Sequence, residues 1–124
     1  MAALDNKVFD EGLSVISDDG NKFVVCSQEP TTFTEADVTY ALGNKTTPTI
    51  AAPSDRTGGG REVILSSFTD GTVTATGTAT HYAILDTVNS LLLATQSLTA
   101  SQALTSGNDL QLTADVSIAI PDPA

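Results

Sequence analysis

The side chains that most often carry catalysis are scarce in this sequence, which contains one histidine, His81, and one cysteine, Cys26. A nucleophilic triad needs an imidazole base beside a serine or cysteine, so His81 is the only candidate for that base. It lies in an apolar segment, and the sequence has no G-x-S-x-G motif, so we interpret His81 as a structural or exposed strand residue. One histidine and one distant cysteine are too few for a zinc site. We interpret Cys26 as a small apolar core residue, because it lacks the electropositive neighbours of a reactive thiol.

Carboxylates are numerous in the chain, and Ca²⁺ is the metal that such oxygen ligands favour. Asp18-Asp19-Gly20-Asn21 has oxygen ligands in a turn but lacks the spacing and the closing glutamate of an EF-hand. We therefore interpret it as the end of a helix. Asp70, Asp86 and Asp109 are interpreted as turn residues that hydrogen-bond to the backbone. A carboxylate pair for glycoside hydrolysis depends on separation in the fold, and aromatic residues that could hold a sugar make up only 5% of the chain.

Two further motifs have simple interpretations. Thr57-Gly58-Gly59-Gly60 lacks the Lys-Ser/Thr that completes a phosphate-binding P-loop, so we predict a flexible loop there. Asn44-Lys45-Thr46 matches a glycosylation acceptor, which has meaning only on a secretory route. We therefore expect no catalytic residue, no cofactor and no metal, and we interpret the chain as a binding or structural protein rather than an enzyme.

The chain is acidic, with a formal net charge of −10 over 124 residues. Such a charge repels phosphate backbones and anionic lipid, so we expect no nucleic acid and no membrane as partners. The basic residues do not cluster; they are Lys7, Lys22, Lys45, Arg56 and Arg61. One cysteine excludes an intrachain disulfide, and there is neither a secretory signal nor an apolar run of about 18 residues. These features predict a soluble protein made in the cytoplasm.

Residues 63–84 are the strongest local indication of the fold. Val63-Ile64-Leu65 is apolar, and residues 72–80 alternate threonine with valine, alanine and glycine. This period of two is typical of a strand with one buried face. Asp70-Gly71, between the two stretches, is a characteristic hairpin turn, so we predict a β-hairpin. Turn signals recur about every ten residues along the chain, which predicts a mainly-β protein, an antiparallel β-sandwich or barrel.

The only helical periodicity in the sequence covers residues 2–17. We therefore expect residues 1–20 to be an N-terminal helical segment and residues 21–124 to be a single antiparallel β domain. Residues 33–41 fit either structure: Thr34 and Asp37 have capping-box spacing, whereas Thr39-Tyr40 favours a strand.

The remaining strands are placed by apolar patterning between turn residues. We predict strands at residues 22–27, 46–52, 81–85, 91–95 and 110–120, and turns or loops at 43–44, 53–60, 86–90, 97–103 and 106–108. Pro48 would place its strand at a sheet edge. We expect the strand at 91–95 to be buried, the strand at 110–120 to be the longest regular one, and Pro121-Asp122-Pro123 to end it.

Four segments occur in a distinctive order. They are C-S-Q-E-P-T-T from Cys26, Y-A-L-G-N-K-T from Tyr40, D-G-T-V-T-A-T-G-T-A-T-H-Y from Asp70 and I-P-D-P from Ile120. Together they resemble a family of small proteins encoded in the structural-gene regions of tailed bacteriophages and prophages. The resemblance extends from about residue 20 to the end of the chain. It implies a location in the virion, after assembly in the host bacterial cytoplasm, and it carries over no catalytic residue.

Within a virion, a small acidic β domain is suited to be a capsid decoration (cement) protein on the outside of the head. Such a protein stabilises the shell by binding only its assembled form. The resemblance implies the major capsid protein or other virion proteins as partners, and a homo-oligomer, with a trimer favoured. We expect contacts through the sheet edge near Pro48 or through the N-terminal segment.

Three alternative functions remain open from the sequence. The first is a structural or adaptor protein of the tail, neck or fibre. The second is a receptor- or glycan-binding module, for which a β-sandwich is a common scaffold. The third is a hydrolase that uses His81, which should lose its activity in His81→Ala.

Overall fold

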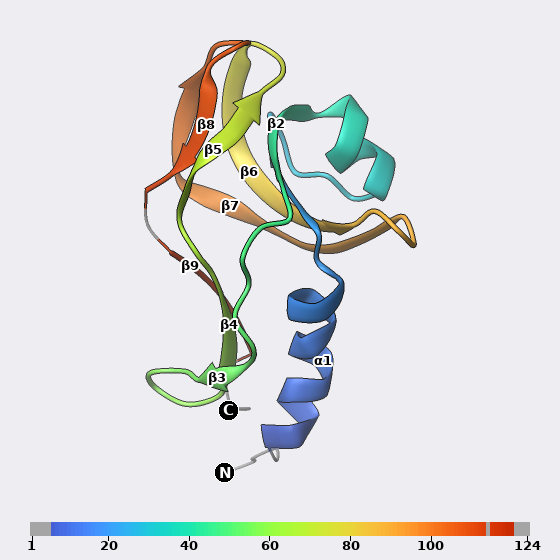
Figure 1. The fold of residues 1–124 in the computed structure, drawn as a ribbon, viewed down its shortest axis with the longest axis vertical. Helices are drawn as coiled ribbons and strands as arrows, with labels where there is room; N and C mark the ends of the chain where they lie inside the picture. The colour runs from blue at the N-terminus through green and yellow to red at the C-terminus, as the bar shows by residue number, and fades with distance from the viewer. Residues whose placement is uncertain (1–5, 114, 121–124) are drawn as a thin grey trace.

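The computed structural model describes residues 6–113 and 115–120 and is mainly β. Its elements in chain order are α1 (Asn6–Asp19), β1 (Lys22–Cys26), the π-helical turn η1 (Glu35–Thr39), β2 (Ala41–Thr46), β3 (Ser54–Asp55), β4 (Arg61–Leu65), β5 (Phe68–Val73), β6 (Gly77–Asp86), β7 (Leu91–Leu104), β8 (Asp109–Leu112) and β9 (Val116–Ile120). A six-stranded sheet has the order β7-β6-β1-β2-β5-β8, and a three-stranded sheet has the order β3-β4-β9. Figure 1 shows the larger sheet strongly curled, with the smaller sheet and α1 at its lower end. The predicted mainly-β antiparallel fold with an N-terminal helix is confirmed.

Strand β1 is the centre of the larger sheet and is buried on both faces. Phe23 and Val25 belong to the main apolar core inside the curled sheet, and Val24 and Cys26 belong to a second apolar cluster on the other face. Ala36, in η1, completes the second cluster. Because successive side chains of a strand point to opposite faces, two covered faces require the unbroken apolar run of this segment. The strand predicted at residues 22–27 is confirmed.

The ambiguous residues 33–41 form a helical turn that leads into β2. Its cap differs from the expected one, because Thr34 makes no capping hydrogen bond with its side chain. Instead, the N–H of Glu35 donates to Oγ1 of Thr32, and the Glu35 carboxylate accepts bonds from the N–H and the hydroxyl of Thr31. The capping box expected at Thr34 and Asp37 was therefore placed two residues too far along the chain.

The N-terminal helix is confirmed over residues 6–17 and continues to Asp19, whereas residues 2–5 lie outside the described part of the chain. Two apolar side chains of the helix face the interior: Leu13 is buried, and Ile16 packs against the main core. Gly20 ends the helix: its N–H donates to the carbonyl of Ile16, and a Cβ at this position would lie 2.4 Å from that same oxygen.

The hairpin predicted at residues 63–84 is wrong. Its first strand, β4, pairs with β3 and β9 in the smaller sheet, whereas β5 and β6 belong to the larger sheet. Asp70-Gly71 lies inside β5, where Gly71 is paired with Leu110. A Cβ on Gly71 would lie 2.9 Å from the Leu110 carbonyl oxygen, so the glycine permits a close approach of strands rather than a turn.

The regular alternation over residues 72–80 does not correspond to one strand, because it spans the end of β5 and the start of β6. Strand β5 ends at Val73 and β6 begins at Gly77. Between them, the N–H groups of Thr74 and Ala75 both donate to the carbonyl of Leu42. Alternation of side chains therefore continues through a bend that separates two strands which are not paired with each other.

Residues 110–120 are two strands in different sheets, not one. Strand β8 pairs with β5, and β9 pairs with β4. Asp115 lies between them, and its Oδ1 accepts the N–H of Ser67 at 2.8 Å. The period of two continues because each strand covers an apolar core with one face. The end predicted at Pro121-Asp122-Pro123 lies outside the described residues.

Strand β7 corrects two further predictions. It is continuous from residue 91 to residue 104, so residues 97–103 belong to a strand rather than a linking loop. It is an end strand of the larger sheet, and Leu91 is 50% exposed, so residues 91–95 are not fully buried. A large bulge opposite Thr80 bends β7, because Ala79 pairs with Gln102 and His81 with Ser97.

The segments around β2 differ from expectation in three places. Gly43-Asn44, predicted as a turn, lies within β2 and pairs with both β1 and β5. Residues 46–52 form no strand of their own beyond the end of β2; an isolated bridge joins Ile50 to Leu65 as the chain passes between the sheets. Pro48 is therefore not on a sheet edge. Residues 53–60 contain the short strand β3 and the turn into β4.

The turns predicted at residues 86–90 and 106–108 are confirmed. Ser90 and Gly107 both have positive φ, 57° and 92° respectively, as such turns often require. None of the helices in the described part of the chain combines the length and apolar character needed to cross a membrane.

Candidate functional site

The structure brings the single cysteine and the single histidine together. Cys26 in β1 is the direct partner of His81 in β6, and opposite residues of antiparallel strands place their side chains on the same face. Cys26 is fully buried, and its thiol donates to the carbonyl oxygen of Ala36 at 3.7 Å. Burial raises the pKa of the Cys26 thiol to about 11. A thiol held in its neutral form is a poor nucleophile, so this pair is not built as a Cys–His catalytic dyad.

His81 has a second partner that defines its tautomer. The Thr80 hydroxyl donates to the carbonyl oxygen of Ser27 at 3.0 Å, and the same Oγ1 lies 2.9 Å from Nδ1 of His81. A hydroxyl has one proton, so with that proton on Ser27 it accepts from an Nδ1–H. The Thr80 hydroxyl thus joins β6 to the segment that follows β1, and the His81 ring bonds to that hydroxyl beside it in β6.

Three of the predicted carboxylate sites are now placed. Asp86 is a turn residue, as predicted: its Oδ1 accepts the N–H groups of Val88 and Asn89, and its Oδ2 accepts from the Asn89 amide. The side-chain bond from Asn89 and the two backbone bonds lower the pKa of Asp86. Asp70 is not in a turn but pairs with Lys45 across the sheet at 2.9 Å, and the bond from Lys45 lowers the pKa of Asp70. Asp109 is the first residue of β8, directly after the turn.

The acidic turn after α1 fastens the helix to the sheet. Oδ1 of Asn21 accepts from the N–H and the hydroxyl of Thr87, while the Asn21 N–H donates to the Leu85 carbonyl. Asp18-Asp19 precede this contact on the exposed end of the helix. In the described ranges, 6–113 and 115–120, no three His, Cys, Asp or Glu side chains gather to hold a metal ion.

The glycine-rich loop and the glycosylation-like motif also have structural positions. The Arg56 guanidinium donates to the carbonyl oxygen of Gly59 at 3.0 Å, and residues 58–60 all have positive φ, so the loop is a turn between β3 and β4. Asn44 lies within β2 and pairs with Val24 and Thr72.

A polar cluster centred on Arg61 joins the helix to the smaller sheet. Arg61 in β4 donates from Nε and Nη2 to the two carboxylate oxygens of Asp10 in α1, at 2.8 and 3.1 Å. Its Nη1 donates to Asp55 at 2.7 Å. The hydrogen bonds to Asp10 and Asp55 raise the pKa of Arg61. In this cluster Arg61 pairs with both carboxylates and so links α1 to β3 and β4.

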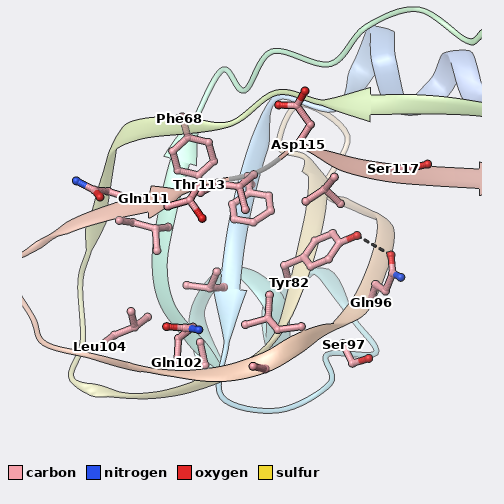
Figure 2. A pocket seen from close by; sticks show the side chains of 18 residues that line it. Phe68, Tyr82, Gln96, Ser97, Gln102, Leu104, Gln111, Thr113, Asp115 and Ser117 are labelled. Atoms are coloured by element: carbon pink, nitrogen blue, oxygen red, sulfur yellow. Dashed lines mark hydrogen bonds between the residues drawn. The ribbon is translucent and has the colours of Figure 1, made fainter.

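A groove of about 560 Å³ lies between β7 and residues 111–113 and 115–117 in the described part of the chain (Figure 2). Its floor is aromatic: Phe23 stacks on Tyr82 and meets Phe68 edge to face, with both centroid separations 5.5 Å. Its mouth is polar. The polar side chains that line it are Gln96, Ser97, Gln102, Gln111, Thr113, Asp115 and Ser117. The Tyr82 hydroxyl donates to Oε1 of Gln96 at 2.6 Å and closes one end of the floor.

Sequence reasoning missed this groove because one wall was interpreted as a loop and the other as an unbroken strand. A signal was present in the charge pattern. Residues 87–108, which include all of β7, contain no Asp, Glu, Lys or Arg in a chain of net charge −10. An edge strand without charges is unusual, because charged side chains commonly protect such edges.

Comparison with known proteins identifies no relative: no family model matches the chain, and no curated protein or solved structure matches it significantly.

Proposed function

We propose that this chain is a structural protein of a tailed-bacteriophage particle, bound as a decoration protein to the outside of the capsid. The observation that carries the proposal is the uncharged end strand β7 beside an open groove. Both features serve the docking of a protein. The side chains of Cys26 and Asp86, in contrast, bond to backbone groups, and the His81 ring lies against the Thr80 hydroxyl, which bonds to the Ser27 carbonyl.

The charge and the sequence resemblance support the position in the particle. A protein of net charge −10 is repelled by packaged DNA, so the outer surface of the shell favours it over the interior. The four segments beginning at Cys26, Tyr40, Asp70 and Ile120 resemble small virion-associated proteins. The partners in this proposal are the major capsid protein and further copies of this chain, with a trimer as the expected oligomer.

Addition of the purified protein to undecorated capsids tests the proposal. We expect saturable, stoichiometric binding and a higher temperature of capsid disruption, since a ligand of the assembled form stabilises it by mass action. Leu91→Lys, which places a charge on the exposed edge of β7, should weaken binding. Thr78→Lys, at an exposed position of the paired strand β6, is the matched control.

Quantitative mass spectrometry of purified virions provides the copy number. A ratio near one chain per major capsid subunit agrees with decoration. A ratio of a few per hundred subunits would instead place the chain in the tail or neck, and failure to bind any capsid form would contradict the proposal.

A further inference from the structure

The groove is bounded by two strands whose outer edges have no partner strand in the described chain. In the larger sheet, β7 and β8 are the two end strands. The sheet curls so that residues of both line one cavity, as Figure 2 shows, with β7 along one side and residues 111–113 and 115–117 along the other. The curled sheet is therefore an incompletely closed barrel with a seam between its end strands.

The free backbone groups of the two end strands indicate what kind of ligand can bind in the seam between them. An edge strand presents N–H and C=O groups along its length, and an extended polypeptide is the ligand that matches such a row. Successive antiparallel pairings from β7 to β8 make these two strands run in opposite directions. A single strand added between them would consequently be antiparallel to one of the two and parallel to the other. Both antiparallel and parallel pairing form backbone hydrogen bonds.

The floor of the groove defines the side chains of the occupant. Beneath the seam lie Phe23, Phe68, Tyr82, Leu98 and Leu112, so every second residue of an added strand would meet an apolar surface. The intervening residues would face outward beside the glutamine, serine and threonine side chains of the mouth. The volume, about 560 Å³, is in the range of roughly 300–1,000 Å³ that specific ligand sites occupy.

Charge restricts the occupant further. Asp115 is the one charged side chain that lines the groove in the described chain, and the chain as a whole carries −10. An acidic segment is therefore repelled, and a basic residue near Asp115 is favoured. A second copy of this chain would bring the same −10 to the contact, which opposes pairing of two β7 edges.

We propose that the seam between β7 and β8 binds an extended segment of a partner protein, neutral or basic and apolar at alternate residues, which adds as a strand to the sheet. The proposal concerns binding alone and does not depend on a location in a virion.

Selection from a displayed library of random linear peptides tests the proposal directly. We expect enriched sequences to alternate apolar and polar residues and to lack aspartate and glutamate. Synthetic copies of the enriched peptides should slow amide hydrogen exchange in residues 96–104 and 111–113, because their free edge groups become hydrogen-bonded. N-methylation of alternate peptide nitrogens should weaken binding at least tenfold, because it removes strand donors without changing side chains.

Two variants locate the site on this chain. Ala100→Trp fills the mouth from an exposed position that lines the groove, and should weaken peptide binding at least tenfold. Thr78→Trp, exposed on β6 and not among the groove residues, should bind as the unchanged protein does. Asp115→Asn keeps an oxygen acceptor for Ser67 and should reduce the preference for basic peptides.

Four outcomes would overturn the proposal. They are the absence of enriched peptides, equal binding by Ala100→Trp and Thr78→Trp, exchange protection confined to elements outside the groove, and a self-association that Ala100→Trp abolishes. The last outcome would identify a second copy as the occupant. Loss of peptide binding in Ala100→Trp together with persistent capsid binding would support the peptide site and leave the proposed function intact.

Discussion

Cys26 and His81 lie directly opposite each other in β1 and β6, yet the cysteine thiol bonds to the Ala36 carbonyl. A cysteine and a histidine, the residue types of a thiol protease, are thus neighbours here. They do not form a reactive pair, because burial keeps the Cys26 thiol neutral. The register of the two strands is sufficient to place these residues side by side, so their proximity alone does not indicate catalysis.

The thiol of Cys26 should be inert in the folded protein. Its pKa of about 11 leaves on the order of one thiolate in a thousand at pH 8, and the side chain is fully buried. We expect alkylation by iodoacetamide, followed by intact-mass spectrometry, to be at least a hundred times slower in buffer than in denaturant. His81→Ala should not change the native rate. Equal rates with and without denaturant would contradict the described burial.

Asp86 should make the stability of the protein depend on pH in the acid range. Its pKa is lowered from the ordinary 3.8, so the unfolded chain binds this proton more readily than the folded one. The stabilisation is therefore complete above about pH 3.8 and is lost as the pH falls through the folded pKa. Asp86→Asn should lower the urea midpoint at neutral pH and flatten its decline between about pH 5 and pH 2.

The matched control for this measurement is Asp109→Asn, which removes a carboxylate from an exposed position at the other confirmed turn. It should leave the acid decline nearly as steep as in the unchanged protein. Equal flattening by both substitutions would show that net charge, rather than the Asp86 turn, determines the pH dependence.

Gly43 and Gly12 should respond to alanine in opposite directions. A Cβ on Gly43 would lie 2.8 Å from the Thr72 carbonyl oxygen and 3.2 Å from Cα of Val73, so Gly43→Ala should cost about 1–3 kcal/mol by forcing β2 from β5. Gly12 is exposed within α1, and Gly12→Ala should stabilise the protein by about 1 kcal/mol. Urea unfolding measures both changes. A neutral Gly43→Ala would show that β5 can move without cost.

Arg61 should hold α1 against the smaller sheet through its two bonds to Asp10. Arg61→Lys retains the charge but loses the planar fork that makes both bonds. We expect amide hydrogen exchange in α1 to become several-fold faster, with little change in β1. Arg56→Lys, whose guanidinium bonds within its own loop, is the control. Unchanged exchange in α1 would show that Leu13 and Ile16 suffice to hold the helix.

The sequence by itself determined the mainly-β class, the N-terminal helix, the strand around Val24 and the turns at residues 86–90 and 106–108. Each of these depends on local properties: a period of two or 3.6, a glycine with positive φ, or an aspartate that bonds to nearby N–H groups. The place of His81 in a strand and the burial of Cys26 in an apolar cluster were likewise indicated by their apolar surroundings. Such signals persist whatever the rest of the chain does.

Only the tertiary structure decided which strands pair, and therefore where the groove lies. Gly71 and Gly43 were interpreted as turn residues, but each permits another strand to approach closely. Residues 110–120 keep one alternation while passing from the larger sheet to the smaller one, because both strands turn one face to the same main core. Pairing depends on contacts between residues far apart in the chain, and side-chain alternation carries no information about the partner strand. The seam between β7 and β8 exists because of those distant pairings.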